Sequence, residues 1–345
     1  MLDVIGNTPL VRLGMDERSK GVVYAKMELM NPFGMKDRVA KHIILEALRC
    51  GDLQPGAPII ETSSGTMACG VALVGTLLGH AVHIVTDPRI DPITHAKLSS
   101  LGCDVHVVEQ MTETGWQGAR LRLLHDIMER LEGAFWTRQY ENPDNPNAYG
   151  ELVQEVQEAI GHVDILVASV GSGGSISGAA RAMRKHNPNL KVVAVDATGS
   201  VIFGQPDRPG RLQGGLGNSL IAPNVDFSQI DEVHWLNDQE AFAATLQLAR
   251  QEKIFAGNSS GSVYAVGRWL STVVEPGTKI LLILPDRGDR YFNTIYSPEY
   301  RQQKGLQEQY LPHAPHRVSA NEVVTQWSWT DWKETFANAA QTGVR

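Results

Sequence analysis

Apolar side chains recur at helical spacing in the segment that follows residue 36. The two apolar rows consist of Val39, Ile43 and Ala47 and of Ala40, Ile44 and Leu48. This spacing predicts an α-helix that begins near Lys36 and ends at Gly51, a residue typical of helix C-termini. Because the start of a helix already carries partial positive charge, basic side chains such as Lys36 and Arg38 are unexpected there.

Apolar runs of strand length alternate with helical segments along most of the chain. Strand, polar loop and helix are predicted in 57–79 and again in 163–186, with further strands at 80–87, 103–109 and 191–196 and helices at 92–102 and 115–131. The last unit of the alternation is the segment 279–291. This order predicts an α/β fold with two parallel-sheet-containing domains and a ligand cleft beyond the carboxyl ends of the strands. A Pro/Asn-rich loop at 140–150 is the expected junction.

The segment 326–340 differs in composition from the rest of the chain, because it holds three of the seven tryptophans. We expect a C-terminal helix that docks on the body of the protein or on a second subunit. The alternative is an aromatic patch that binds a partner protein.

Composition excludes several classes of function. The chain has 345 residues, of which 42% are hydrophobic, and a formal net charge of -7. This mildly acidic balance argues against a nucleic-acid partner, and no apolar run approaches the length of a membrane span. The sequence opens without the pattern of a signal peptide. Three scattered cysteines, Cys50, Cys69 and Cys103, give no metal or disulfide pattern and fit a cytoplasmic protein.

A glycine-rich loop follows the predicted strand that ends near Val170. Its residues are Gly171, Ser172, Gly173, Gly174 and Ser175, and a helix is predicted directly after them. Backbone N–H groups at such a helix start bind anions, so a phosphate group is the expected ligand. A dinucleotide fold and a purely structural turn are the alternatives. Asp196 suits the dinucleotide fold, but Ile176 stands where its third glycine should fall.

Three other loops carry small polar residues or an acid that could bind a ligand. The loop with Ser63, Ser64, Gly65 and Thr66 could hold a substrate carboxylate or could cap a helix. Ser259 begins another predicted helix, and Pro285 and Asp286 leave the last predicted strand.

Lys36 can now be given a function. A partly desolvated lysine has its charged form disfavoured and becomes nucleophilic at lower pH. A lysine suited to Schiff-base formation, together with a separate phosphate cup, points to pyridoxal phosphate.

The combined motifs resemble one known family. The segments "NPFGMKDR", "ETSSGTMACG", "QYENPDNPNA", "GSGGSISG", "AGNSSGS" and "LPDRGDRY" follow the order found in fold-type II pyridoxal-phosphate enzymes of the cysteine synthase and cystathionine β-synthase family. "VIGNTPLVRL" at 4–13 is similar to the N-terminal signature of that family, and the resemblance covers residues 1 to about 300. Segments such as "VDATGSVIFG" are most similar to a siderophore-pathway branch, the N-(2-amino-2-carboxyethyl)-L-glutamate synthases.

The resemblance implies a role for each matching residue. The cofactor would be held by Lys36, Thr66, Gly171, Ser172, Gly173, Gly174, Ser175 and Ser259. Lys36 would be the Schiff-base lysine and the acid/base at Cα, and Ser259 would face the pyridine nitrogen. The amino-acid substrate would be held by Ser63, Ser64, Gly65, Gln139 and Gly215. Arg211 is the candidate for a second carboxylate of the nucleophile, with an ordinary solvated loop arginine as the alternative.

The resemblance also implies an architecture. A larger cofactor-binding domain would comprise 1–35 and 147–300, and a smaller mobile substrate domain would comprise 36–146. The tail 301–345 would pack on the body or on the second subunit of a homodimer.

Three motifs depart from the family pattern. Thr66 replaces an asparagine that bonds the ring oxygen of the cofactor, and we expect its hydroxyl to take over that bond. The loop before Lys36 is one residue shorter than usual and lacks a serine. The segment "YGELVQEV" also lacks the histidine and Thr-Gly of the family.

The implied reaction is β-replacement on an O-activated L-serine. O-phospho-L-serine and L-glutamate would give N-(2-amino-2-carboxyethyl)-L-glutamate for 2,3-diaminopropionate and siderophore-type biosynthesis. A cysteine synthase that uses sulfide is the first alternative. The others are a catalytically silent binding protein, which the intact Lys36 disfavours, and a nucleotide-binding oxidoreductase, which Ile176 disfavours.

Overall fold

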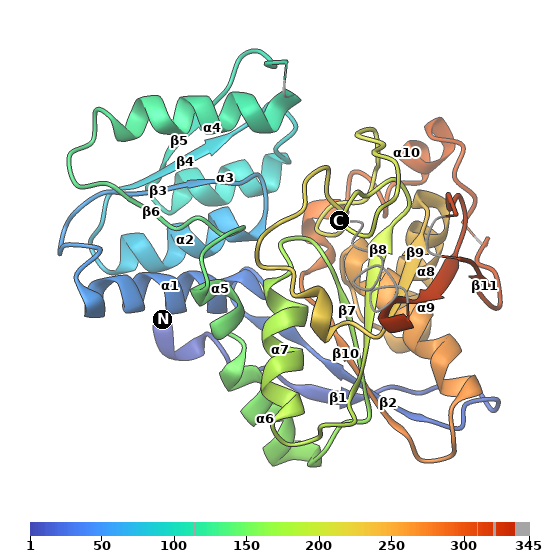
Figure 1. Cartoon of the computed structure of the whole chain (residues 1–345). Coiled ribbons are helices and arrows are strands. Elements are labelled where there is room, and N and C mark those ends of the chain that lie inside the picture. The colour runs from blue at the N-terminus through green and yellow to red at the C-terminus, as the bar shows by residue number, and fades with distance from the viewer. Residues whose placement is uncertain (114, 309, 320–321, 335–345) are drawn as a thin grey trace.

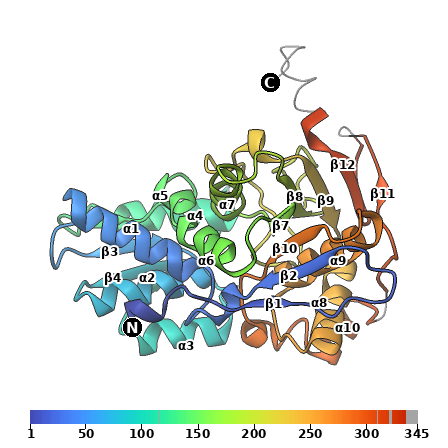
Figure 2. The same ribbon diagram turned by 90° about the horizontal axis from the view of Figure 1, so that it is seen from below.

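The computed structural model describes residues 1–113, 115–308, 310–319 and 322–334. It contains two β-sheets, each with helices on both faces (Figures 1 and 2). The larger sheet consists, in spatial order, of β1 (Leu10–Arg12), β2 (Val22–Lys26), β10 (Lys279–Ile283), β7 (Ile165–Ser169), β8 (Lys191–Ala197), β9 (Glu232–Leu236), β12 (Ser328–Asp331) and β11 (His316–Arg317). The smaller sheet consists of β5 (Asp104–Val107), β4 (Val82–Thr86), β3 (Ile59–Thr62) and β6 (Phe135–Trp136).

Parallel pairing dominates both sheets, as the strand–helix alternation predicted. All pairs of the smaller sheet are parallel. In the larger sheet the run β2, β10, β7, β8 and β9 is parallel, while β1 and β12 are added antiparallel at either side of it. The α/β fold class is therefore confirmed. The domain limits and the mobility of the smaller domain stay predictions.

Helices cover the sheets. They are α1 (Lys36–Cys50), α2 (Thr66–Leu77), α3 (Pro92–Ser100), α4 (Gly115–Met128), α5 (Asp144–Asn147), α6 (Gly150–Ile160), α7 (Gly174–Arg184), α8 (Asp238–Glu252), α9 (Asn258–Val273) and α10 (Pro298–Gln303). Four short 3₁₀ helices are η1 (Leu2–Val4), η2 (Glu28–Met30), η3 (Phe227–Gln229) and η4 (Gly288–Tyr291). The loop expected at 140–150 thus contains α5 and the start of α6.

Alternating strand residues divide the core between the two faces of each sheet. In the smaller sheet, Ile59 and Ile84 belong to the apolar cluster with α1 and α2, whereas Ile60 and Val85 pack with α4. Figure 1 shows α4 on one side of this sheet and α2 and α1 on the other. The larger sheet separates α7 from α8 and α9 in the same way. This two-sided burial explains why the strands are almost continuous apolar runs.

The predicted helix at 36–51 is confirmed in detail. It runs from Lys36 to Cys50, and Gly51 ends it with a left-handed φ of 89°. The helix packs against α2 of the smaller sheet. Among the described residues no helix combines the length and the apolar character that crossing a membrane requires.

The prediction of a helix at 326–340 is wrong for its first part. Residues 328–331 form β12, which pairs antiparallel with β9, and residues 335–340 lie outside the described residues. Trp327 is 2% exposed and donates its indole N–H to His234 Nδ1 at 3.2 Å. The strand is favoured over a helix because β9 would otherwise present an unpaired row of backbone groups.

We predict that the tail is part of the folded body. Trp327→Ala should lower the free energy of unfolding by about 3–5 kcal/mol, because it removes a fully buried indole. Trp329→Ala is the matched control, since Trp329 is two residues along the chain, in β12, and is only half-buried, so its removal should cost less. Urea denaturation followed by far-UV circular dichroism measures both. Equal, small effects would mean that the tail does not contribute to the core.

Candidate active site

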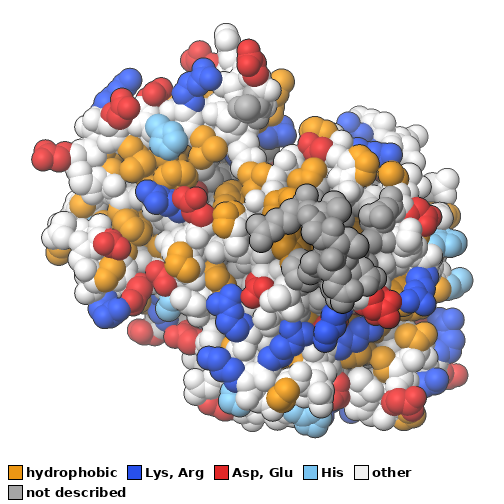
Figure 3. Space-filling view, viewed as in Figure 1, with side chains coloured by type: hydrophobic (Ala, Val, Ile, Leu, Met, Phe, Trp, Pro, Cys, Tyr) orange, Lys and Arg blue, Asp and Glu red, His pale blue; other side chains and the backbone are white. Residues whose placement is uncertain are grey.

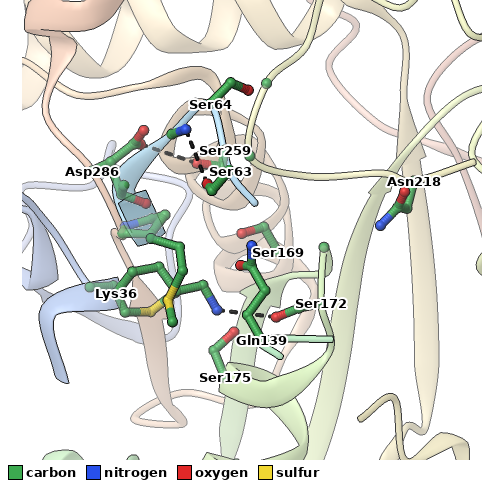
Figure 4. Close-up of a pocket in the computed structure, with 18 of the residues that line it drawn as sticks. Lys36, Ser63, Ser64, Gln139, Ser169, Ser172, Ser175, Asn218, Ser259 and Asp286 are labelled. Atoms are coloured by element: carbon green, nitrogen blue, oxygen red, sulfur yellow. Dashed lines mark hydrogen bonds between the residues drawn. The ribbon is translucent and has the colours of Figure 1, made fainter. Parts of the chain in front are cut away.

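The carboxyl ends of β3, β7 and β10 meet at a cavity of about 270 Å³ between the two sheets. Its walls include the loop after β3 with Ser63 and Thr66, the glycine-rich loop after β7, and Asp286 after β10. Figure 3 shows the surface indented between the two parts of the molecule, and Figure 4 shows the cavity itself. Strand C-termini are where α/β proteins bind ligands, so the position agrees with the predicted cleft.

Lys36 is the first residue of α1 and its side chain enters this cavity. Its Nζ donates a hydrogen bond to Ser172 Oγ at 3.1 Å (Figure 4). Removal from water lowers the pKa of Lys36 from 10.5 to about 8, while the charge of Glu61 opposes the shift. A substantial fraction of the amine is therefore neutral near physiological pH.

The glycine-rich loop forms the wall next to Lys36. Gly171, Ser172 and Ser175 line the cavity, and α7 begins within the loop. The first N–H groups of a helix lack intrahelical partners and attract anions. Gly173 and Gly174 are behind this wall and are not among the lining residues.

Close packing explains the two rear glycines. A Cβ on Gly174 would come within 2.1 Å of Asn145 Oδ1, and one on Gly173 within 2.5 Å of a methyl group of Val225. Gly173 also has a φ of +82°, which side-chain-bearing residues rarely adopt. These two glycines shape the loop by letting α5 and the segment at 225 approach it.

The second predicted loop lies on the opposite side of the cavity. Ser63, Ser64, Gly65, Thr66 and Gln139 all line it. The Gly65 N–H donates to Ser63 Oγ at 3.2 Å, and Gln139 Nε2 donates to the Thr62 carbonyl at 3.5 Å. Hydroxyl, amide and helix-start N–H groups are thus gathered at the beginning of α2.

Ser259 and Gly215 complete the predicted set. Ser259 is in the first turn of α9, and its Oγ donates to Asp286 Oδ1 at 3.4 Å. Gly215 lines the cavity with a φ of +85°. Predicted residues from six separate segments of the chain are therefore brought together at one cavity.

Arg211 is not brought there. Its guanidinium donates to Asp207 Oδ1 at 3.0 Å, to Ser219 Oγ at 3.2 Å and to the carbonyl of Gly199, and it does not line the cavity. The contacts of Arg211 are therefore those of an ordinary loop arginine, which was the alternative to a role in substrate binding.

Two other arginines line the cavity, and sequence reasoning did not identify either. Arg120 comes from α4, and its NH1 is 3.2 Å from Asp87 Oδ2, whereas its buried Nε has no hydrogen-bond partner. Arg290 comes from η4, and its NH2 donates to the Ser64 carbonyl at 3.5 Å. No sequence motif around Arg120 in the predicted helix 115–131 indicates a binding role. Arg290 belongs to the motif "LPDRGDRY", which could have identified it.

In the described part of the chain no group of three or more His, Cys, Asp or Glu side chains could hold a metal ion. The three cysteines are free.

The cavity residues fit pyridoxal phosphate. A nucleophilic amine at Lys36 stands beside a helix-start anion cup, with which it shares Ser172. Separate polar groups at 63–66 remain for an amino-acid carboxylate. The cavity thus places an amine suited to covalent attachment beside a helix start suited to an anion.

Comparison with known proteins agrees with this fit. The signature of the family described as pyridoxal-phosphate dependent enzyme matches residues 1–286. The N-(2-amino-2-carboxyethyl)-L-glutamate synthase of Cupriavidus metallidurans is 37% identical over 307 residues, which are 86% of this chain and 89% of that protein.

Solved structures show the same fold. Cysteine synthase from Entamoeba histolytica superimposes with a TM-score of 0.80 at 28% identity, covering 86% of this chain and 89% of that one. The O-acetylserine dependent cystathionine β-synthase from Helicobacter pylori gives a TM-score of 0.79 at 28% identity, covering 86% and 98%. The chain belongs to the pyridoxal-phosphate-dependent enzymes of the cysteine synthase type, which catalyse β-replacement on serine derivatives.

Proposed function

We propose that the enzyme replaces the phosphate of O-phospho-L-serine with the amine of L-glutamate. The product would be N-(2-amino-2-carboxyethyl)-L-glutamate, a precursor of 2,3-diaminopropionate for siderophore-type biosynthesis. The observation that carries this proposal is the pair of arginines, Arg120 and Arg290, at a cavity that already has a polar loop for one carboxylate. Phosphoserine and glutamate each bring an anionic oxygen group besides the α-carboxylate, whereas sulfide brings no carboxylate or phosphate for an arginine to bind. The 37% identity to a synthase of this product supports the same assignment.

The guanidiniums are suited to such anions because their donors are incompletely used. Arg290 NH1 and Nε are 4.0 Å and 3.7 Å from the carboxylates of Asp286 and Asp91, and its one hydrogen bond to protein is long. Arg120 keeps an unpartnered buried Nε. Charge-assisted bonds to phosphate or carboxylate would satisfy these donors.

Different residues of the cavity would bind the cofactor, orient the substrate and transfer the proton. The helix-start N–H groups of α7, with Ser172 and Ser175, would hold the cofactor phosphate. Ser63, Gly65 and Gln139 would orient the substrate carboxylate. Lys36 Nζ, once released by the incoming amino acid, would take the proton from Cα. Pyridoxal phosphate, when bound, supplies a conjugated ring that accepts the electron pair left at Cα.

The burial of Lys36 serves this proton transfer. A base is most effective when its pKa lies near the working pH, and the pKa of Lys36 is lowered to about 8. Thr66 lines the cavity at the start of α2, and we propose that its hydroxyl bonds the ring oxygen of the cofactor.

Two further proposals concern the location and the oligomeric state of the protein. We propose a cytoplasmic location, with which three free cysteines are compatible. We also expect a homodimer.

A cysteine synthase that uses sulfide is the second candidate function. It is favoured by the structural likeness to cysteine synthase from Entamoeba histolytica. The two candidates share the cofactor and the first half of the reaction, so the identity of the nucleophile separates them.

The first prediction tests the covalent anchor. Borohydride reduction of the holoenzyme followed by peptide mass spectrometry should place the phosphopyridoxyl group on Lys36. Lys41→Ala, five residues along the same helix, should retain the label, and Lys36→Ala should lose it. A label on another residue would refute the assignment of Lys36, and no label on any residue would favour a silent binding protein.

The second prediction tests the nucleophile. With O-phospho-L-serine as first substrate, L-glutamate should saturate the enzyme and give the glutamate adduct, identified by mass spectrometry. Arg120→Gln should lower kcat/KM by about 10- to 150-fold, the equivalent of about 1.5–3 kcal/mol for a hydrogen bond to a charged group. Arg122→Gln, an exposed position on the same helix, should have little effect. Efficient cysteine formation from sulfide with no glutamate adduct would make the enzyme a cysteine synthase.

A further inference from the structure

A short helix next to the active-site cavity contains a fully buried asparagine. Asn145 belongs to α5, is 0% exposed and does not line the cavity. Helix α5 packs against α1, which begins at Lys36, and against α7, which begins at Gly174 (Figure 1). Asn145 therefore lies beside the elements whose first residues would hold the cofactor.

Both hydrogens of the Asn145 amide are used in hydrogen bonds. Its Nδ2 donates to the Gln139 carbonyl at 2.6 Å and to Ser172 Oγ at 3.2 Å. A carbonyl oxygen only accepts hydrogen bonds, so the side-chain atom that faces it is the nitrogen, and the amide cannot be turned over. One amide group thus bonds the glycine-rich loop and the residue that carries the Gln139 side chain.

Close packing holds the amide in this orientation. A Cβ on Gly174 would come within 2.1 Å of Asn145 Oδ1, and one on Gly178 within 2.0 Å of the Pro146 carbonyl, so α7 approaches α5 closely at two glycines. Asn145 Oδ1 has no hydrogen-bond partner in the described part of the chain. A buried acceptor without a partner costs stability, which is unexpected for a side chain that only supports the fold.

The bond from Asn145 limits the directions open to the Ser172 hydroxyl. A serine hydroxyl has one hydrogen to donate and two lone pairs that accept. One lone pair accepts the Asn145 N–H, and Lys36 Nζ donates to the same oxygen at 3.1 Å (Figure 4). The Ser172 hydrogen cannot point at Asn145, so it is left for an acceptor in the cavity that Ser172 lines.

We infer that Asn145 is a positioning residue that makes Ser172 a hydrogen-bond donor to the phosphate of the cofactor. The inference rests on the proposed placement of that phosphate at the start of α7. Ionised phosphate oxygens accept hydrogen bonds, and such charge-assisted bonds are the stronger ones. The same amide holds the Gln139 carbonyl, so it also ties the phosphate site to a residue proposed to orient the substrate carboxylate.

Binding of two cofactor analogues measures what the phosphate contributes. Pyridoxine phosphate carries the phosphate but no aldehyde, so it binds without covalent attachment to Lys36, and pyridoxine lacks the phosphate. The apoprotein is titrated with each compound in a calorimeter. Ser172→Ala should lower the affinity for pyridoxine phosphate by about 10- to 150-fold, the range for a hydrogen bond to a charged group, and should leave that for pyridoxine unchanged.

The variant that tests Asn145 is Asn145→Asp, which keeps the size of the side chain but places an oxygen where Nδ2 faces Ser172. That oxygen accepts the Ser172 hydrogen in either protonation state, because a proton on it would be drawn to the Gln139 carbonyl. Ser172 then no longer donates to the phosphate, so adding Ser172→Ala to Asn145→Asp should change the affinity for pyridoxine phosphate little. Asn147→Asp, at an exposed position of the same helix, should leave the full effect of Ser172→Ala.

Equal effects of Ser172→Ala in the wild type and in the Asn145→Asp background would overturn the inference. An unchanged affinity for pyridoxine phosphate after Ser172→Ala alone would overturn it too, and this result needs no Asn145 variant to fold. Failure of the proposed function is distinguishable from both. Wild-type protein would then bind pyridoxine as tightly as pyridoxine phosphate, which contradicts the phosphate site itself and the inference with it.

Discussion

The buried guanidinium of Arg38 is the contact on which the active site depends. It donates to both oxygens of Glu28 at 2.7 and 3.0 Å and to both oxygens of Glu155 at 2.8 Å. Glu28 follows β2 of the larger sheet, Glu155 is in α6, and Arg38 is two residues after Lys36 in a helix that packs against α2. The network thus fixes the first turn of α1 between the two sheets. Removing one partner of such a buried pair costs about 3–5 kcal/mol, so little freedom is left for the position of Lys36.

The same network explains the basic residues at the start of a helix. Arg38 is neutralised by two carboxylates, and Lys26 adds a second buried cation that donates to Glu155. Among the described residues Lys36 forms no ion pair with a carboxylate, and its amine is desolvated instead. Arg38 therefore stabilises the fold, while Lys36 has a lowered pKa and an amine that bonds only the Ser172 hydroxyl at the cavity.

Most of the site was predictable because its residues lie at strand ends and helix starts. Gly171 and Ser63 follow the buried strands β7 and β3 and precede helices, and parallel sheets bring such strand ends together. Ser259 lies in the first turn of α9. Arg120 was not predictable, since nothing in α4 distinguishes it from exposed Arg122. Arg211 was assigned from the resemblance to the siderophore-pathway branch, but in the structure its guanidinium bonds Asp207 and Ser219 of its own loop. Residues 328–331 form a strand because they pair with β9, which is far away in the sequence. A local sequence pattern does not reveal such a pairing, and the tail was therefore predicted to be a helix.

Burial at the start of α1 lowers the pKa of Lys36 to about 8, so that a substantial fraction of its amine is neutral near physiological pH. The most direct test is the rate of pyridoxal phosphate binding to the apoprotein as a function of pH, followed by stopped-flow absorbance. Only the neutral amine reacts, so the rate constant should rise with pH and level off above an apparent pKa of about 8. A rate that continues to rise toward 10.5, the ordinary pKa of a lysine, would show that Lys36 is solvated and would contradict the account.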